Sequence, residues 1–169
     1  MKRACVIFLA GILTVALGLP VSAAQPETGS YEVNNLDDPD VFGDACGEGA
    51  DLVGVFEAKG RFEVFRDGEG NPTRIQFQEV FNGTFTRTDT GNSVRDPGRY
   101  TGIIDLVTGL ETYQGSYWNI VYPGIGIVYH SVGRSVFTEP DFGNRIFQAG
   151  YSDVVNGKDL FTEVCDALA

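Results

Sequence analysis

The sequence contains one histidine, His130, and only three cysteines among its 169 residues. A single histidine excludes any metal site built from several imidazoles. The sequence also lacks an HExxH motif, a paired CxxC, a phosphate-binding glycine loop and a Gly-x-Ser-x-Gly turn. A catalytic triad would have to use His130, which lies in an apolar segment typical of a strand. The sequence therefore predicts no metal and no cofactor, and it favours a protein that is not an enzyme.

Positive charge is also scarce. The chain has 12 Lys and Arg against 23 Asp and Glu, which gives a net charge of -11. Lys2 and Arg3 fall in the leader described next, which holds no acidic residue, so without the leader the net charge becomes -13. Such a surface repels phosphate backbones, and this predicts that nucleic acid is not a partner.

Only one long apolar segment is present, and it lies at the N-terminus. Residues 6–19 carry no charge and follow Lys2 and Arg3. The segment is shorter than the roughly 20 residues that span a bilayer as a helix. It is followed by Val21-Ser22-Ala23-Ala24, with small residues where a signal peptidase reads them. Residues 1–24 are therefore predicted to be a signal peptide cleaved near Ala24, and the protein is expected to be secreted without membrane insertion.

Cleavage of the leader removes Cys5 and leaves Cys46 and Cys165, which we expect to form a disulfide in an oxidising compartment. The long loop that this bond closes implies a stabilisation of about 4–5 kcal/mol in the chain-entropy account. Residues 25–45 are polar and acidic, which predicts a mobile tail. Residues 46–169 are then one domain, long enough to bury a core.

The pattern of the domain predicts β-strands, because short apolar runs alternate with turn residues and the chain holds 22 Gly, 12 Phe and 7 Tyr. Only residues 158–168 have a helical apolar stripe. Seven to nine strands without a long crossover predict an antiparallel up-and-down meander closed as a small barrel, with glycines at sharp bends and a short C-terminal helix. A β-sandwich is the alternative.

Several short motifs occur in a particular order along residues 46–169. They are Cys46-Gly47, Thr90-Gly91, a Val-Gly-Arg-Ser-Val-Phe run at residues 132–137, Ala149-Gly150 and Cys165. In this order the chain resembles a set of small secreted bacterial proteins of unassigned function, which look like lipocalin-like or allene-oxide-cyclase-like barrels. The resemblance implies the barrel fold and no particular activity.

Glu79 stands out in the segment 74–86, because it falls in the apolar phase of the alternation, between Phe77 and Phe81. If the strand is regular, a carboxylate points inward, where desolvation raises its pKa. Glu79 is then the best candidate acid, base or ligand anchor in the chain. Two alternatives remain open: a β-bulge near Gln78 would turn Glu79 outward, or Asn82-Gly83 would be a hairpin turn that breaks the strand.

Aromatic residues are abundant in two successive predicted strands, residues 112–122 and 125–132. Tyr117, Trp118 and Tyr129 are expected to pack in the core or, together with Glu79, to line a ligand site. We therefore predict a secreted barrel that binds a small, largely apolar ligand without catalysis. The alternatives are a cyclase or isomerase that uses Glu79, with His130 as a second candidate catalytic residue, and an extracellular surface interaction module. The oligomeric state stays open.

Overall fold

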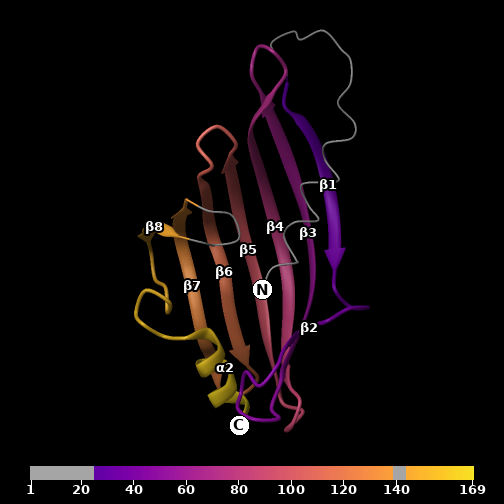
Figure 1. Cartoon of the computed structure of the whole chain (residues 1–169), viewed down its shortest axis with the longest axis vertical. Helices are drawn as coiled ribbons and strands as arrows, with labels where there is room; N and C mark the ends of the chain where they lie inside the picture. Colours follow the sequence, from indigo (N-terminus) through magenta and orange to yellow (C-terminus); the bar gives the residue numbers. More distant parts are fainter. Residues whose placement is uncertain (1–24, 139–143) are drawn as a thin grey trace.

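The computed structural model describes residues 25–138 and 144–169, and the predicted signal peptide lies outside this part of the chain. The described residues form an antiparallel sheet and a C-terminal helix, which confirms the predicted all-β meander (Figure 1). The elements are β1 (Glu27–Asn34), β2 (Asp40–Phe42), β3 (Leu52–Arg66), β4 (Pro72–Arg87), β5 (Ser93–Asp105), β6 (Glu111–Tyr122), β7 (Gly126–Phe137), β8 (Arg145–Ala149) and α2 (Leu160–Leu168).

The sheet is open. Its strands lie in the order β1-β3-β4-β5-β6-β7-β8, with β2 paired to β3. Within the described residues β1 and β8 are the two edges and do not pair with each other, so the predicted closure into a barrel is not shown. Closure requires the stagger of the strands to bring the first and last strands together, and the short β8 pairs only with β7. The sandwich alternative is not found either, because the strands in the described part of the chain all belong to one sheet.

The segment 25–45, which its composition predicts to be a mobile tail, instead pairs with the sheet. It forms β1, which pairs with β3 over eight residues, and the short β2, which pairs with the start of β3. Tyr31 and Val33 are half-buried while their neighbours in β1 are exposed. This alternation, together with the main-chain hydrogen bonds of the ladder, explains how so acidic a segment is held on the sheet.

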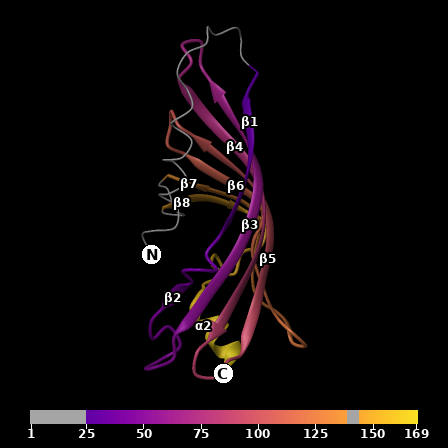
Figure 2. The same ribbon diagram turned by 90° about the vertical axis from the view of Figure 1, so that its right-hand side faces the viewer.

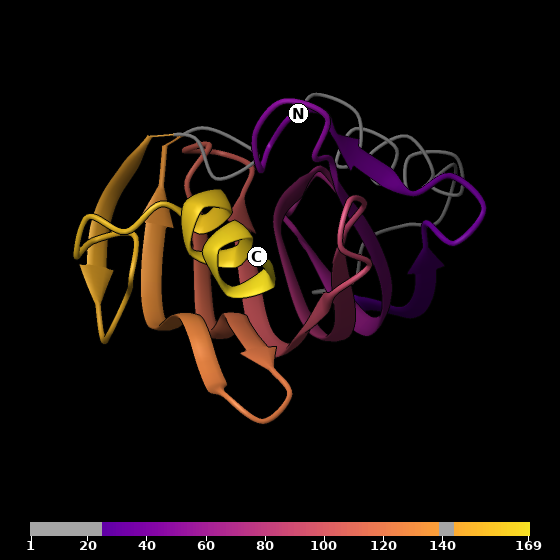
Figure 3. The same ribbon diagram turned by 90° about the horizontal axis from the view of Figure 1, so that it is seen from below.

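Helix α2 covers one end of one face of the sheet. Asp159 caps it, since its side chain accepts a hydrogen bond from the backbone N–H of Thr162. Val164 and Leu168, on the buried side of α2, form a cluster of fully buried residues with Leu52, Val94, Ile120 and Tyr129 of the sheet. Figure 2 shows that the sheet curves along its strands. Figure 3, which looks at the molecule from below, shows α2 lying across the near end of the sheet. We call the face that carries α2 the inner face.

A disulfide between Cys46 and Cys165 ties α2 to the segment that precedes β3, which confirms the predicted pairing. The two Cα atoms lie 5.2 Å apart, while the residues are 119 positions apart in sequence. No helix within the described residues has the length and apolar character needed to cross a membrane.

Glycines permit a sharp bend across one side of the sheet. Gly115 pairs with Gly133, and Gly150, just after β8, lies directly against Gly133. All three have positive φ, at 138°, 128° and 99°. Most L-residues avoid this conformation, and a side chain at Gly133 would also meet the backbone of Ala149. Three aligned glycines therefore let β6, β7 and the end of β8 kink together.

Candidate functional site

The candidate site is a row of residues that lie side by side across neighbouring strands. In the register, Tyr31 on β1 pairs with Gly60 on β3, Gly60 pairs with Glu79 on β4, and Glu79 pairs with Tyr100 on β5. Glu79 lies in the same phase of β4 as Phe85, which packs against the buried cluster beneath α2. The row therefore lies on the inner face.

Neither of the two alternatives for Glu79 is found. The pairing of β4 with β3 and β5 is continuous through Gln78 and Glu79, so no bulge turns the carboxylate outward. Asn82-Gly83 lies within β4 and is not a turn. The apolar alternation is thus unbroken, and Glu79 is half-buried among the inner-face residues.

Two tyrosines hold the Glu79 carboxylate. Tyr31 donates its phenol proton to Oε2 over 2.7 Å, and Tyr100 donates to Oε1 over 2.6 Å. Burial raises the pKa of both phenols well above the ordinary value of 10.0, and the charge of Glu79 and its hydrogen bonds raise these pKa values further. Both tyrosines therefore stay protonated and act as donors to the Glu79 carboxylate.

Gly60 makes the contact between Tyr31 and Glu79 possible. It lies between them in the register, and the Tyr31 side chain crosses over it. A Cβ at position 60 would lie 2.6 Å from the phenol oxygen of Tyr31 and 2.5 Å from the backbone oxygen of Gln78. Any other residue at position 60 would displace the tyrosine from the carboxylate.

A layer of aromatic rings surrounds this row on the inner face. Tyr100 packs edge-on against Phe77 and Phe81, with ring centroids 6.0 Å away in both cases. Tyr113 continues the layer at 5.8 Å from Tyr100, and Phe137 lies 5.9 Å from Tyr113. Such edge-to-face geometry is favourable for aromatic pairs. The result is an apolar surface with the Glu79 carboxylate within it.

Two further carboxylates lie on the same face. Glu111 is buried and accepts a hydrogen bond from Tyr113 over 2.8 Å. Asp96 is only 2% exposed and accepts a hydrogen bond from the backbone N–H of Asn119 over 2.8 Å. Burial raises the pKa of Asp96 to about 6, and the hydrogen bond from Asn119 opposes this rise. The inner face therefore has acidic groups on both sides of the aromatic layer.

The three aromatic residues predicted to line the site, Tyr117, Trp118 and Tyr129, do not lie beside Glu79. Tyr129 belongs to the buried cluster beneath α2, and Trp118 packs against that cluster. Tyr117 is buried and hydrogen-bonds the Ser135 hydroxyl over 2.6 Å and the side-chain oxygen of Gln148 over 3.1 Å. The structure thus uses all three in packing or in a buried polar contact, and it brings none of them into contact with Glu79.

His130 is not brought to Glu79 either. Its neighbours in β7, Tyr129 and Ser131, are buried on the inner face, so alternation places His130 on the opposite face. There its backbone N–H donates to Asp153, and its ring lies 6.0 Å from the ring of Tyr151. The two candidate catalytic residues therefore lie on opposite faces of the sheet and cannot act on one substrate.

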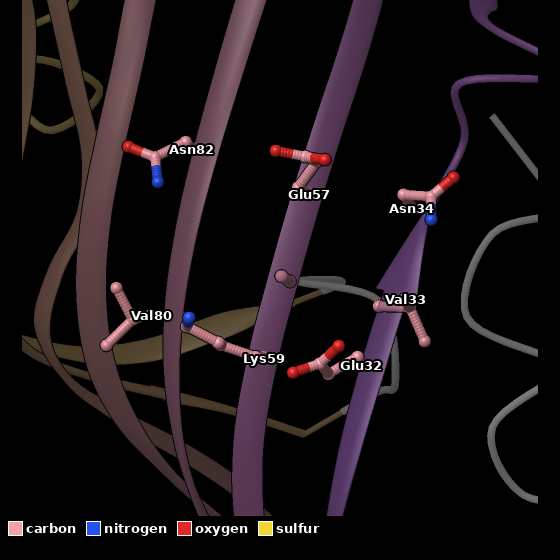
Figure 4. Close-up of a pocket in the computed structure, with 8 residues that line it drawn as sticks. Glu32, Val33, Asn34, Glu57, Lys59, Val80 and Asn82 are labelled. Carbon is pink, nitrogen blue, oxygen red and sulfur yellow. The ribbon is translucent and has the colours of Figure 1, made fainter.

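Two surface hollows lie away from the aromatic layer. One, of about 200 Å³, lies against β1, β3 and β4 on the face opposite α2, with Glu32, Glu57, Lys59 and Asn82 around it (Figure 4). The other is a wide depression beside β8, lined in part by Phe147 and Val154. The first mixes charges of both signs and has no aromatic wall. Neither hollow contains Glu79.

Tyr31 and Tyr100 are the site residues that sequence reasoning missed. Alternation in the segment 99–107 does place Tyr100 on one face of a strand, but the strand register that aligns it with Glu79 is not readable from one strand. No protein-family model, curated protein or solved structure matches this chain. The site is therefore interpreted from its own chemistry.

Proposed function

We propose that this protein is a secreted binding protein whose inner face holds a small, largely apolar ligand, without catalysis. One observation carries the proposal: the carboxylate of Glu79 is positioned by Tyr31 and Tyr100 within a layer of half-buried aromatic rings. The rings offer apolar contact area, and the carboxylate offers one oriented polar contact. Ligand sites commonly combine a mostly apolar surface with a few well-placed polar groups.

Burial of a ligand on an open sheet is less complete than in a closed cavity. We therefore expect modest affinity, since the contact area must offset the entropy lost on binding. A cyclase or isomerase that uses Glu79 as a base is the second candidate, favoured by the same held carboxylate. It is weaker because His130, the second candidate acid or base, lies on the opposite face.

The proposal is tested with N-phenyl-1-naphthylamine, a neutral apolar dye that fluoresces on leaving water. We expect the disulfide-bonded protein to bind the dye, and Phe81→Ala to weaken binding several-fold, because Phe81 packs against Tyr100 in the aromatic layer. Val80→Ala is the matched control, since the exposed Val80 lies next to Phe81 in β4 and on the opposite face.

Retention of the fold is checked by circular dichroism for both variants. Absence of dye binding, or equal loss of binding in the Phe81→Ala and Val80→Ala variants, would refute the inner face as the binding surface. Conversion of an added substrate, abolished by Glu79→Gln, would support the enzyme candidate instead.

A further inference from the structure

We propose that the ligand of the inner face is an organic cation, an amine or quaternary ammonium on an apolar body, whose positive group lies beside Glu79. The inference rests on the proposed function and adds the chemical class of the ligand. Three independent features carry it: the distribution of charge between the two faces of the sheet, the arrangement of the Glu79 carboxylate, and the aromatic rings next to it.

In the middle of the sheet, positive charge is confined to the face opposite α2. No Lys or Arg occupies the central inner-face positions of four strands. These positions run from Leu52 to Val64 in β3, from Ile75 to Phe85 in β4, from Val94 to Ile104 in β5 and from Tyr129 to Phe137 in β7. The alternate positions of the same strands, on the opposite face, mix six cations with three acids: Lys59, Arg61, Arg74, Arg95, Arg99 and Arg134 with Glu57, Glu63 and Asp105.

The inner face instead holds Glu79, Asp96 and Glu111. The basic residues in phase with it stand at strand ends: Arg66 pairs with Glu27, Arg87 pairs with Asp89, and Arg145 lies opposite Phe137 at the start of β8. A partly desolvated surface with charge of one sign attracts the opposite charge and repels its own. The middle of the inner face therefore favours a cation over a neutral or anionic ligand of the same shape.

The Glu79 carboxylate can accept more than its two phenol bonds. A carboxylate has about four acceptor sites, and Tyr31 and Tyr100 use one on each oxygen. An ammonium N–H can use a remaining site, and a quaternary ammonium can be attracted by the charge alone. Both phenols donate to the carboxylate, so they hold it in place without neutralising its charge.

The neighbouring rings suit the same ligand. Phe77, Phe81 and Tyr100 are half-buried and meet edge-to-face around the position of Glu79. The π-face of an aromatic ring attracts a cation, and carboxylate-flanked aromatic surfaces combine this attraction with a full negative charge. Within the described residues, no group of three or more His, Cys, Asp or Glu is arranged to hold a metal ion, so the expected cation is organic.

The test compares three meta-substituted phenols of different charge, of which the cation and the neutral probe have the same shape. They are 3-hydroxyphenyl-trimethylammonium, its neutral carbon isostere 3-tert-butylphenol, and the anion 3-hydroxybenzoate. Binding to the disulfide-bonded protein is measured by isothermal titration or ligand-observed NMR at low and high salt. We expect the cation to bind about tenfold more tightly than the neutral isostere, the anion to bind least, and the preference to shrink in high salt.

Two variants locate the effect. Glu79→Gln should reduce the affinity for the cation to that for the neutral isostere while leaving 3-tert-butylphenol unchanged. Glu57→Gln removes the same charge from the opposite face of β3 and should keep the preference. Equal binding of cation and isostere to the unmodified protein would overturn this inference and leave the proposed function standing. Failure of all three probes and of the neutral dye would overturn both.

Discussion

The far edge of the Phe77 ring lies over the backbone of Gly102 on the neighbouring strand, in the space that a Cβ at position 102 would occupy. Phe81 covers Gly98 on β5 in the same way. The pairing of a ring on one strand with a glycine on the next lets the aromatic layer lie close to the sheet. The backbone of these glycines is thus shielded by side chains from the adjacent strand.

Gly102→Ala should therefore destabilise the protein by about 1–3 kcal/mol, because the added methyl group overpacks against the Phe77 ring. Gly68→Ala is the control: no atom lies within 4 Å of a Cβ built there. Urea unfolding of both variants measures the difference. If the two variants were equally stable, the ring would be free to move away and the close-packed layer would be wrong.

Removal of the Tyr100 hydroxyl should cost stability through Glu79. In Tyr100→Phe the carboxylate loses one of its two donors while remaining half-buried, so we expect a loss of about 1–2 kcal/mol. A double-mutant cycle with Glu79→Gln isolates the coupling between the two side chains. A coupling energy of zero would show that the bond contributes nothing beyond ring packing.

Asp96 should make stability depend on pH. Its pKa is about 6 in the folded protein against an ordinary value of 3.8, so between these pH values the native state binds more protons than the unfolded state. The contribution of Asp96 to the free energy of unfolding therefore falls as pH rises through that window, by roughly 3 kcal/mol in total. Asp96→Asn keeps an acceptor for the Asn119 N–H and removes the charge.

We expect Asp96→Asn to be more stable than the unmodified protein at pH 8 and to lose this advantage at pH 4. Urea unfolding at both pH values measures it, with the exposed Asp37→Asn as the control for a change in net charge. An Asp96→Asn variant that is no more stable at pH 8 would show that the ionised carboxylate is well accommodated.

The disulfide should account for a large share of the stability. It links residues 119 positions apart, so reduction or a Cys46→Ser/Cys165→Ser variant should cost about 4–5 kcal/mol. Titration of the denatured, unreduced protein should find no free thiol at these positions. A reduced protein of unchanged stability would mean that packing of Val164 and Leu168 alone holds α2 on the sheet.

The local features of the chain were readable in advance. Turn residues and period-two alternation predicted the strands, the stripe through Phe161 and Leu168 predicted the helix, and the Cys46–Cys165 pair predicted the disulfide. The phase of Glu79 in its strand was also readable, because alternation within one strand depends only on neighbouring residues. The strand formed by residues 27–34 was missed because its acidic composition outweighs a weak alternation.

The sequence by itself determined that the chain makes an antiparallel meander with a helix at its end, and it placed Glu79 in the apolar phase of its strand while a bulge or a turn stayed open. Only the tertiary structure decided that Tyr31 and Tyr100 meet this carboxylate, that Tyr129 is core, and that His130 faces away. It also left the sheet open in the described part of the chain. The reason is physical: alternation is a property of one strand, whereas register and closure arise from pairing and twist between strands that are distant in sequence.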